Sequence, residues 1–207
     1  MSAPITHLLY LHGFRSSPQS TKARMTAAWV QAQRPDLTWC CPQLPASPRA
    51  AMALVMDLID GHHTAHTPWP DGQYAVIGSS LGGFYATAVA QRTGCRAVLL
   101  NPAINPARDL VKYIGELDAW HSDERLHFDA AFIDELHDLT PMLLTDLARY
   151  FAVIAKGDEV LDWQEMTARY AGCAIKLLAD SNHALTDYAE HLPAVADFLG
   201  LAPAVSA

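Results

Sequence analysis

The segment Gly78–Gly82 reads Gly-Ser-Ser-Leu-Gly and matches the pattern G-x-S-x-G. This pattern is typical of a nucleophilic serine on a sharp strand-to-helix turn, where the two glycines let the strand and the helix pass closely. The apolar run Tyr74–Ile77 before it and the helix-forming run Phe84–Ala90 after it fit that setting. The central residue of such a turn points its oxygen outward, so Ser80 rather than Ser79 is the predicted nucleophile. The alternative is a glycine-rich turn in which Ser80 only caps a helix, although the glycines and lysine of a phosphate-binding turn are missing.

A serine nucleophile needs a base and an acid, which follow it along the chain in the order acid, then histidine. Asp158 leaves the strand-like run Phe151–Ala155 in a turn, where a carboxylate can hold an imidazole in its useful tautomer. Glu159 is adjacent and Asp162 is nearby, but Asp162 stands at the N-cap position of a predicted helix. Asp158 is therefore the predicted acid.

The predicted base is His183, in the loop that follows the apolar run Ala174–Leu178. The chain has ten histidines, so only the position in the order serine, acid, histidine distinguishes one of them. His191 is an alternate base, but it falls at the approach to the last helix. The other alternative is that His183 is a lone surface histidine.

Attack by serine on an ester puts negative charge on the carbonyl oxygen, which fixed backbone amides can stabilise. One donor is expected to be the amide of Leu81, directly after the nucleophile, and the second the amide of Phe14. Phe14 follows a His-Gly pair that ends an apolar strand, although a simple strand-ending turn would look the same. Arg15 can bind an acidic substrate group or stand solvated beside a helix start. The candidate substrate contacts are His12, Gly13, Arg15 and Asn101.

Short apolar runs must position these residues, and their length and their flanking Gly, Pro, Asp or Asn favour strands over helices. Most are continuously apolar, as expected for parallel strands covered on both faces. The six runs are Leu8–Leu11, Leu37–Cys41, Tyr74–Ile77, Ala97–Leu100, Tyr150–Ala155 and Ala174–Leu178.

Helix signals alternate with these runs. Ser17-Pro18 predicts a helix that continues to about Arg34, and Ser47-Pro48 predicts a second one. A third is expected to begin after Asp162, and a fourth near Leu192, where Pro193 would occupy the first turn and Gly200 would end the helix. The sequence thus predicts one α/β domain over residues 1–207, with a doubly wound, mostly parallel sheet of about six strands.

An insertion follows the fourth strand, because residues 102–148 are far more than a crossover needs. It includes a predicted helix around Ala131–His137 and a charged portion around Asp118–Arg125. Such an insertion is either a lid over the site or a surface decoration. We favour a lid, because catalytic loops in open α/β sheets gather at the carboxyl ends of the strands.

Composition excludes several classes of function. A net charge of −8 argues against nucleic acid as a partner, since phosphate binding needs a basic face. No run approaches the roughly 18 apolar residues of a membrane span and no signal peptide opens the chain, so a cytoplasmic protein is expected. His62 and His66 could share a helix face and bind a metal ion, but no acidic ligand accompanies them and a solvated loop is the preferred interpretation. No metal or organic cofactor is expected, and the sequence makes no prediction of oligomeric state.

The motifs, taken together, resemble those of the YqiA-like esterases over nearly the whole chain. The similar segments are Leu8–Pro18, Pro42–Pro45, Gly78–Thr87, Asn101–Ala103, Gly157–Asp162 and Asn182–Ala184. The resemblance implies a compact α/β hydrolase that cleaves carboxylic esters, with acyl-CoA thioesters among its substrates. It places the triad on Ser80, Asp158 and His183 and the oxyanion donors on Phe14 and Leu81. No motif of the family matches residues 108–148.

The resulting hypothesis is a serine esterase that works through an acyl-enzyme on a small ester or thioester. A serine peptidase or an acyltransferase would use the same triad. A non-catalytic binding protein would normally have lost a member of the triad.

Overall fold

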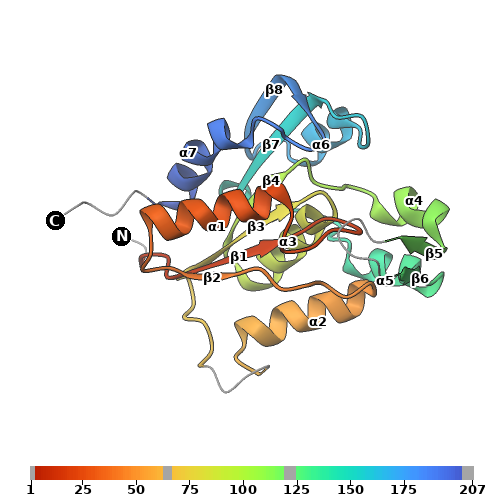
Figure 1. Ribbon diagram of the computed structural model, residues 1–207, viewed down its shortest axis with the longest axis horizontal. Coiled ribbons are helices and arrows are strands. Elements are labelled where there is room, and N and C mark those ends of the chain that lie inside the picture. The colour runs from red at the N-terminus through yellow and green to blue at the C-terminus, as the bar shows by residue number, and fades with distance from the viewer. Residues whose placement is uncertain (1–2, 63–66, 119–124, 202–207) are drawn as a thin grey trace.

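The computed structural model describes residues 3–62, 67–118 and 125–201 (Figure 1). Its centre is a six-stranded sheet with the order β2-β1-β3-β4-β7-β8, in which every neighbouring pair is parallel. The prediction of a doubly wound parallel sheet is confirmed. The strands are β1 (His7–Leu11), β2 (Thr38–Cys40), β3 (Tyr74–Ser79), β4 (Arg96–Leu100), β7 (Tyr150–Gly157) and β8 (Ala174–Asn182).

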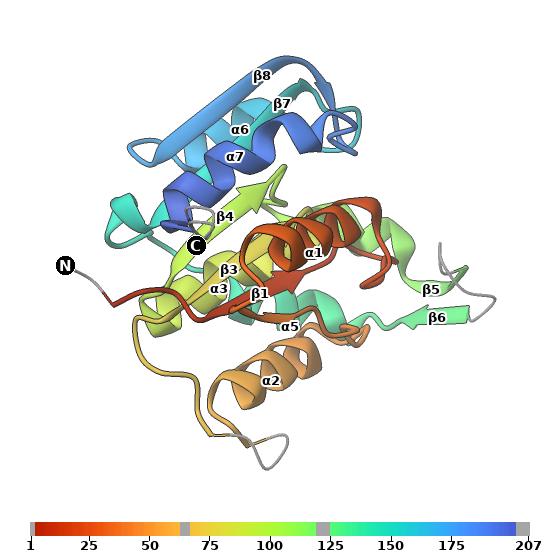
Figure 2. The ribbon, with the colours of Figure 1, turned by 60° about the vertical axis from the view of Figure 1, so that its left-hand side comes forward.

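Alternate side chains of these apolar strands enter two separate cores. On β1, for example, Leu8 and Tyr10 face one core, while Leu9 and Leu11 face the other. Helices α1 (Thr21–Gln33) and α7 (Tyr188–Leu199) cover the first face (Figure 2). Helices α2 (Pro48–Ile59), α3 (Leu81–Thr93) and α6 (Trp163–Arg169) cover the second. Burial on both faces explains why the strands read as continuous apolar runs.

Two predicted helix starts are wrong, and two are confirmed. Ser17 and Pro18 form a turn before α1, with the Ser17 hydroxyl accepting from the amide of Gln19, and the helix begins only after Ser20. Helix α7 begins at Tyr188, so Pro193 lies inside it. By contrast, the side chains of Ser47 and Asp162 accept hydrogen bonds from the first turns of α2 and α6, as their sequence positions predicted.

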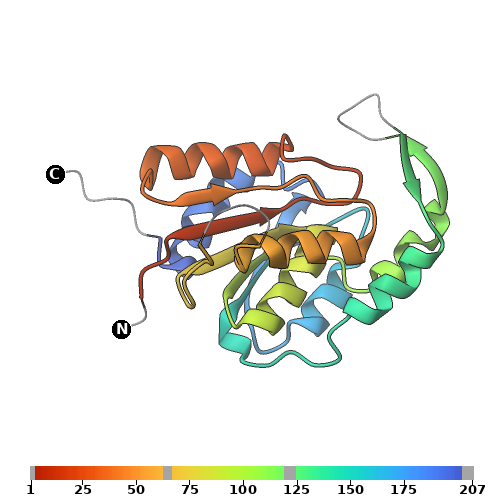
Figure 3. The ribbon, with the colours of Figure 1, turned by 90° about the horizontal axis from the view of Figure 1, so that it is seen from below.

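The insertion between β4 and β7 carries its own small elements. They are α4 (Pro106–Leu110), η1 (Val111–Tyr113), the antiparallel pair β5 (Gly115–Asp118) and β6 (Arg125–Phe128), α5 (Ala131–Leu139) and η2 (Leu147–Arg149). Figure 3 shows the β5–β6 pair standing out from the end of the sheet. A carboxylate oxygen of Glu135 on α5 accepts from the Ser47 hydroxyl (2.7 Å) and from the Arg49 amide (3.0 Å). The predicted helix in the insertion is confirmed, and these contacts hold it against the start of α2.

No helix in the described ranges is long and apolar enough to cross a membrane.

Candidate active site

Ser80 stands alone between the last residue of β3 and the first residue of α3. Its backbone has φ +56° and ψ −120°, a conformation that L-residues rarely adopt. A non-glycine residue held there costs on the order of 1–3 kcal/mol, which the surrounding structure must offset. The Ser80 amide donates to Leu100 on β4 (3.0 Å), and its carbonyl accepts from Ala103 (3.0 Å). The turn that the G-x-S-x-G pattern predicted is therefore present and fixed on both sides.

Gly78 and Gly82 allow the strand and the helix to cross at this turn. A Cβ on Gly78 would lie 2.1 Å from the Gly82 carbonyl oxygen, and a Cβ on Gly82 would lie 2.0 Å from the Leu11 carbonyl oxygen. Both obstacles are backbone atoms, which cannot swing aside. Only glycine fits either position, and the two glycines bring the start of α3 against the end of β1.

Asp158 and His183 meet in a direct hydrogen bond, with 2.7 Å between the His183 Nδ1 and one carboxylate oxygen of Asp158. The other carboxylate oxygen accepts from the amides of Val160 (2.9 Å) and Leu161 (2.8 Å). The Asp158 side chain is 0% exposed and that of His183 is 19% exposed. A buried carboxylate with these partners holds the Nδ1 proton of the imidazole, which leaves Nε2 as the proton acceptor.

The residues that the sequence offered as alternatives to the predicted triad make other contacts. Glu159 accepts from the backbone amide of His183 (3.1 Å) rather than from its ring, and Asp162 caps α6. The Nε2 of His191 pairs with Asp187 (3.0 Å). Ser79 is buried but borders the cavity described below.

The loop after β1 brings Gly13 and Phe14 to the nucleophile. A Cβ on Gly13 would lie 3.3 Å from the Ser80 Cβ, so the loop passes directly beside the serine. His12 supports this loop, because its Nε2 accepts from the Leu44 amide (3.1 Å) and its Nδ1 lies 3.0 Å from the Gly13 carbonyl oxygen. Leu81 opens α3, where the first amides of a helix have no partner within the helix. Both predicted oxyanion donors thus belong to backbone segments next to Ser80.

The four candidate substrate contacts divide into two pairs. Gly13 and Arg15 line the cavity, whereas His12 and Asn101 are buried and do not line it. The Asn101 amide nitrogen donates to the carbonyls of Asn182 (3.0 Å) and His183 (3.2 Å), and its oxygen accepts from the Ala155 amide (2.8 Å). The interpretation of Asn101 as a substrate contact is therefore corrected: its side chain is committed to the backbone beneath the histidine.

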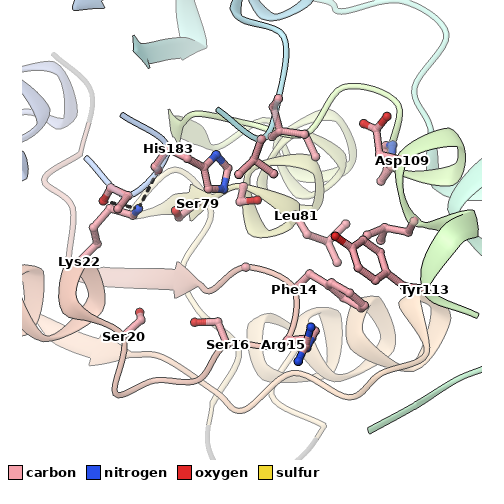
Figure 4. Close-up of a pocket in the computed structure, with 18 of the residues that line it drawn as sticks. Phe14, Arg15, Ser16, Ser20, Lys22, Ser79, Leu81, Asp109, Tyr113 and His183 are labelled. Carbon is pink, nitrogen blue, oxygen red and sulfur yellow. Dashed lines mark hydrogen bonds between the residues drawn. The ribbon is translucent and has the colours of Figure 1, made fainter. Parts of the chain in front are cut away.

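Sequence reasoning missed Lys22, which lies in the first turn of α1. Its ammonium donates to the carbonyls of Ala184 (2.8 Å) and His183 (3.4 Å), as Figure 4 shows. Burial lowers the pKa of Lys22 to about 8, and the nearby Asp158 carboxylate partly opposes this shift. No local motif signals this contact, because it joins residues 161 positions apart.

A cavity of about 340 Å³ connects these parts, with Ser80, His183, Gly13 and Leu81 among its lining residues. Apolar side chains of the insertion, including Pro106, Leu110 and Tyr113, line it as well. The centroid of the Phe14 ring lies 5.5 Å from that of Tyr113 and 5.3 Å from that of Phe128, so aromatic contacts join the loop after β1 to the insertion. The insertion therefore forms a wall of the cavity, while its movement as a lid stays a prediction.

Nothing among the described residues gathers three or more His, Cys, Asp or Glu side chains into a candidate metal site. His62 is exposed, with its Nδ1 4.0 Å from a carboxylate oxygen of Asp57. His66, its partner in the hypothetical metal pair, lies outside the described residues.

Comparison with known proteins agrees with this architecture. A family model described as "Uncharacterised protein family (UPF0227)" matches residues 7–200. A protein from Agrobacterium vitis S4 is similar in structure, with a TM-score of 0.73 at 14% identity over 95% of this chain and 91% of that one. The mouse alpha/beta hydrolase domain-containing protein 10 gives a TM-score of 0.66 at 15% identity, over 96% and 92% of the two chains. Est1E from Butyrivibrio proteoclasticus gives 0.65 at 16% identity, over 95% and 87%. At these identities the likeness establishes the α/β-hydrolase fold and no more.

Proposed function

Because the chain belongs to the uncharacterised protein family UPF0227 and has the α/β-hydrolase fold, we propose that it is a serine hydrolase that cleaves carboxylic esters or thioesters. The observation that carries the proposal is the buried Asp158 carboxylate bonded to the Nδ1 of His183, in a cavity that His183 shares with Ser80. A catalytic role for all three also explains why the fold maintains the strained backbone of Ser80.

In the first half of the reaction, the Nε2 of His183 takes the hydroxyl proton of Ser80 as the serine oxygen bonds to the acyl carbon. The carbonyl oxygen becomes an oxyanion, which accepts hydrogen bonds from the Phe14 and Leu81 amides. The bond from the acyl carbon to the leaving oxygen or sulfur then breaks, and the leaving group takes the proton from His183. Asp158 stabilises the imidazolium throughout this step.

In the second half, His183 takes a proton from water, whose oxygen attacks the acyl carbon of the acyl-enzyme. The new tetrahedral intermediate uses the same two amides. Its collapse returns the proton to Ser80 and releases the carboxylic acid. The steps need no group beyond the protein and water.

The test is hydrolysis of a short p-nitrophenyl ester by the wild-type protein and by Ser80→Ala and His183→Ala, with intact mass after a fluorophosphonate probe. Loss of a triad member typically costs about 10⁴–10⁶ in turnover, so both variants should fall by that order. The probe mass should appear on Ser80 of the wild type and be absent from Ser80→Ala. A wild type that neither turns over the ester nor takes the label would overturn the proposal and favour a non-catalytic binding protein.

A further inference from the structure

The wall of the cavity differs in chemistry from one side to the other. In Figure 4, Lys22, Ser20 and Ser16 lie along one side, with the Lys22 ammonium turned toward the histidine loop, while Leu81, Phe14 and Tyr113 lie toward the other side. All three residues of the polar side belong to the segment between β1 and the first turn of α1. An apolar group and a strongly polar group of one molecule would therefore bind on opposite sides of the cavity.

The polar side offers hydrogen-bond donors to a ligand. An ammonium has three donors, and the two carbonyls of the histidine loop use two of those on Lys22. The Ser20 hydroxyl makes no capping hydrogen bond to α1. Ser16 adds a second hydroxyl to the lining.

The charge of the cavity is opposite to that of the chain. The chain has a net charge of −8, yet three basic residues line the cavity with one carboxylate. That carboxylate, Asp109, already accepts a hydrogen bond from Arg108 (2.7 Å). Lys22 lies on the polar side, whereas Arg15 lies beside Phe14 and Lys112 beside Tyr113 on the other side. Burial disfavours the charged form of Lys22, so an anion beside it would relieve a cost that the fold already carries.

The position of His183 determines which part of the substrate lies near Lys22. His183 must hand its proton to the leaving oxygen or sulfur, so the leaving group lies on the histidine side of Ser80. Lys22 is bonded to the backbone of His183 itself, which places its ammonium on that same side. The acyl group then points toward the apolar wall of Phe14 and Tyr113.

We propose that Lys22, Ser16 and Ser20 form a subsite for an anionic group, a carboxylate or a phosphate, on the alcohol or thiol part of the substrate. This inference rests on the proposed hydrolase function and narrows its substrate class. The preferred substrates have an apolar acyl group and a negatively charged leaving group. A charge-assisted hydrogen bond contributes about 1.5–3 kcal/mol, which corresponds to about a 10–100-fold preference.

Two thioesters that differ only in charge test the subsite: the S-butanoyl derivatives of 3-mercaptopropanoate and of 3-mercaptopropanamide. The wild type should show a kcat/KM about 10–100 times higher for the acid than for the amide. Lys22→Met should bring this ratio close to one, and Lys22→Arg should keep most of it. The ratio is the readout, because Lys22 also supports the histidine loop and its loss lowers turnover of both substrates.

Lys112→Met is the matched control, since Lys112 lines the cavity from the insertion side and its ammonium lies 5.2 Å from the Tyr113 ring centroid. It should keep the wild-type ratio; a ratio that falls in Lys112→Met and not in Lys22→Met would overturn the subsite. Calorimetric binding of both thioesters to Ser80→Ala protein gives the same preference without catalysis. Equal affinity for acid and amide there refutes the subsite even if the wild type hydrolyses both, whereas unequal affinity without turnover refutes only the hydrolase.

Discussion

Asp158 uses its two carboxylate oxygens for different purposes, one for the imidazole of His183 and one for two backbone amides. In Asp158→Asn the amide oxygen would keep the bonds to Val160 and Leu161, which turns the NH₂ group toward the Nδ1 of His183. That nitrogen must then accept, so the ring proton moves to Nε2 and the base can no longer take the proton of Ser80. We expect kcat to fall by about 10⁴, as it does when a serine protease loses this carboxylate in the same way.

Steady-state rates of Asp158→Asn, with Ser80→Ala as the floor, measure this loss. Because the bonds to the two amides survive, the melting temperature should stay close to that of the wild type, which separates a wrong tautomer from misfolding. Activity within tenfold of the wild type would mean that Glu159, whose carboxylate accepts from the His183 amide, can replace Asp158 as the orienting acid.

The sequence indicates the candidate triad more readily than the residues that support its loops. Ser80, Asp158 and His183 each follow a recognisable strand, and their order along the chain is itself a signal. Lys22 and Asn101 act through contacts with residues 161 and 81 positions away, respectively, and neither has a local pattern. Such residues become visible only when the fold has brought their segments together.

At the scale of elements, helix starts were the weakest predictions, for a physical reason. Proline tends to occupy the first turn of a helix, so Pro18 and Pro193 both predict a helix start. Pro18 belongs instead to a turn that precedes α1. Pro193 is exposed within α7, and the carbonyl that it leaves unpaired belongs to Ala189, which is also exposed, so water can replace the missing bond. Burial, which the local sequence does not reveal, decides whether a helix tolerates proline.

The crossing of α3 over β1 gives a prediction about stability. In Gly82→Ala the new methyl carbon would lie 2.0 Å from the Leu11 carbonyl oxygen and 2.6 Å from that of His12. Since backbone atoms block it, the helix must shift, and we expect a loss of about 3 kcal/mol in the free energy of unfolding, near the upper end of overpacking costs. Urea denaturation measures it.

Gly72→Ala is the matched control, because it also adds one methyl group to a glycine. At Gly72 no atom lies within 4 Å of the new carbon. Because Gly72 has a positive φ of +71°, the alanine should lower the free energy of unfolding by about 1 kcal/mol. Activity should not change. If Gly82→Ala were no more destabilising than Gly72→Ala, the close crossing would not be what makes glycine necessary there.

At the scale of the whole molecule, the site exists because parallel strands end at the same edge of the sheet. The ends of β1, β3, β7 and β8 supply the loop with Gly13 and Phe14, Ser80, Asp158 and His183, respectively. Asn101, at the end of β4, lies among them with φ +42° and bonds to the backbone of β7 and of the histidine loop. One buried side chain thus sets the spacing between the strand that precedes Asp158 and the loop that carries His183.

Asn101→Ala should therefore affect both stability and turnover. It leaves the buried Ala155 amide without its acceptor, at a cost of about 1–3 kcal/mol for a buried unsatisfied group. The Asn182 and His183 carbonyls lose one donor each but keep the Leu185 amide and the Lys22 ammonium, respectively. A displacement of the base by about 1 Å can cost about 10² in rate, so kcat should fall by about that factor with little change in KM.

Thr93→Ala is the comparison, because Thr93 also bonds to backbone but lies at the far end of α3, about 18 Å along the helix from Leu81. It should lose comparable stability and keep its kcat. Equal losses of kcat in the two variants would show that Asn101 supports the fold in general and does not position the base.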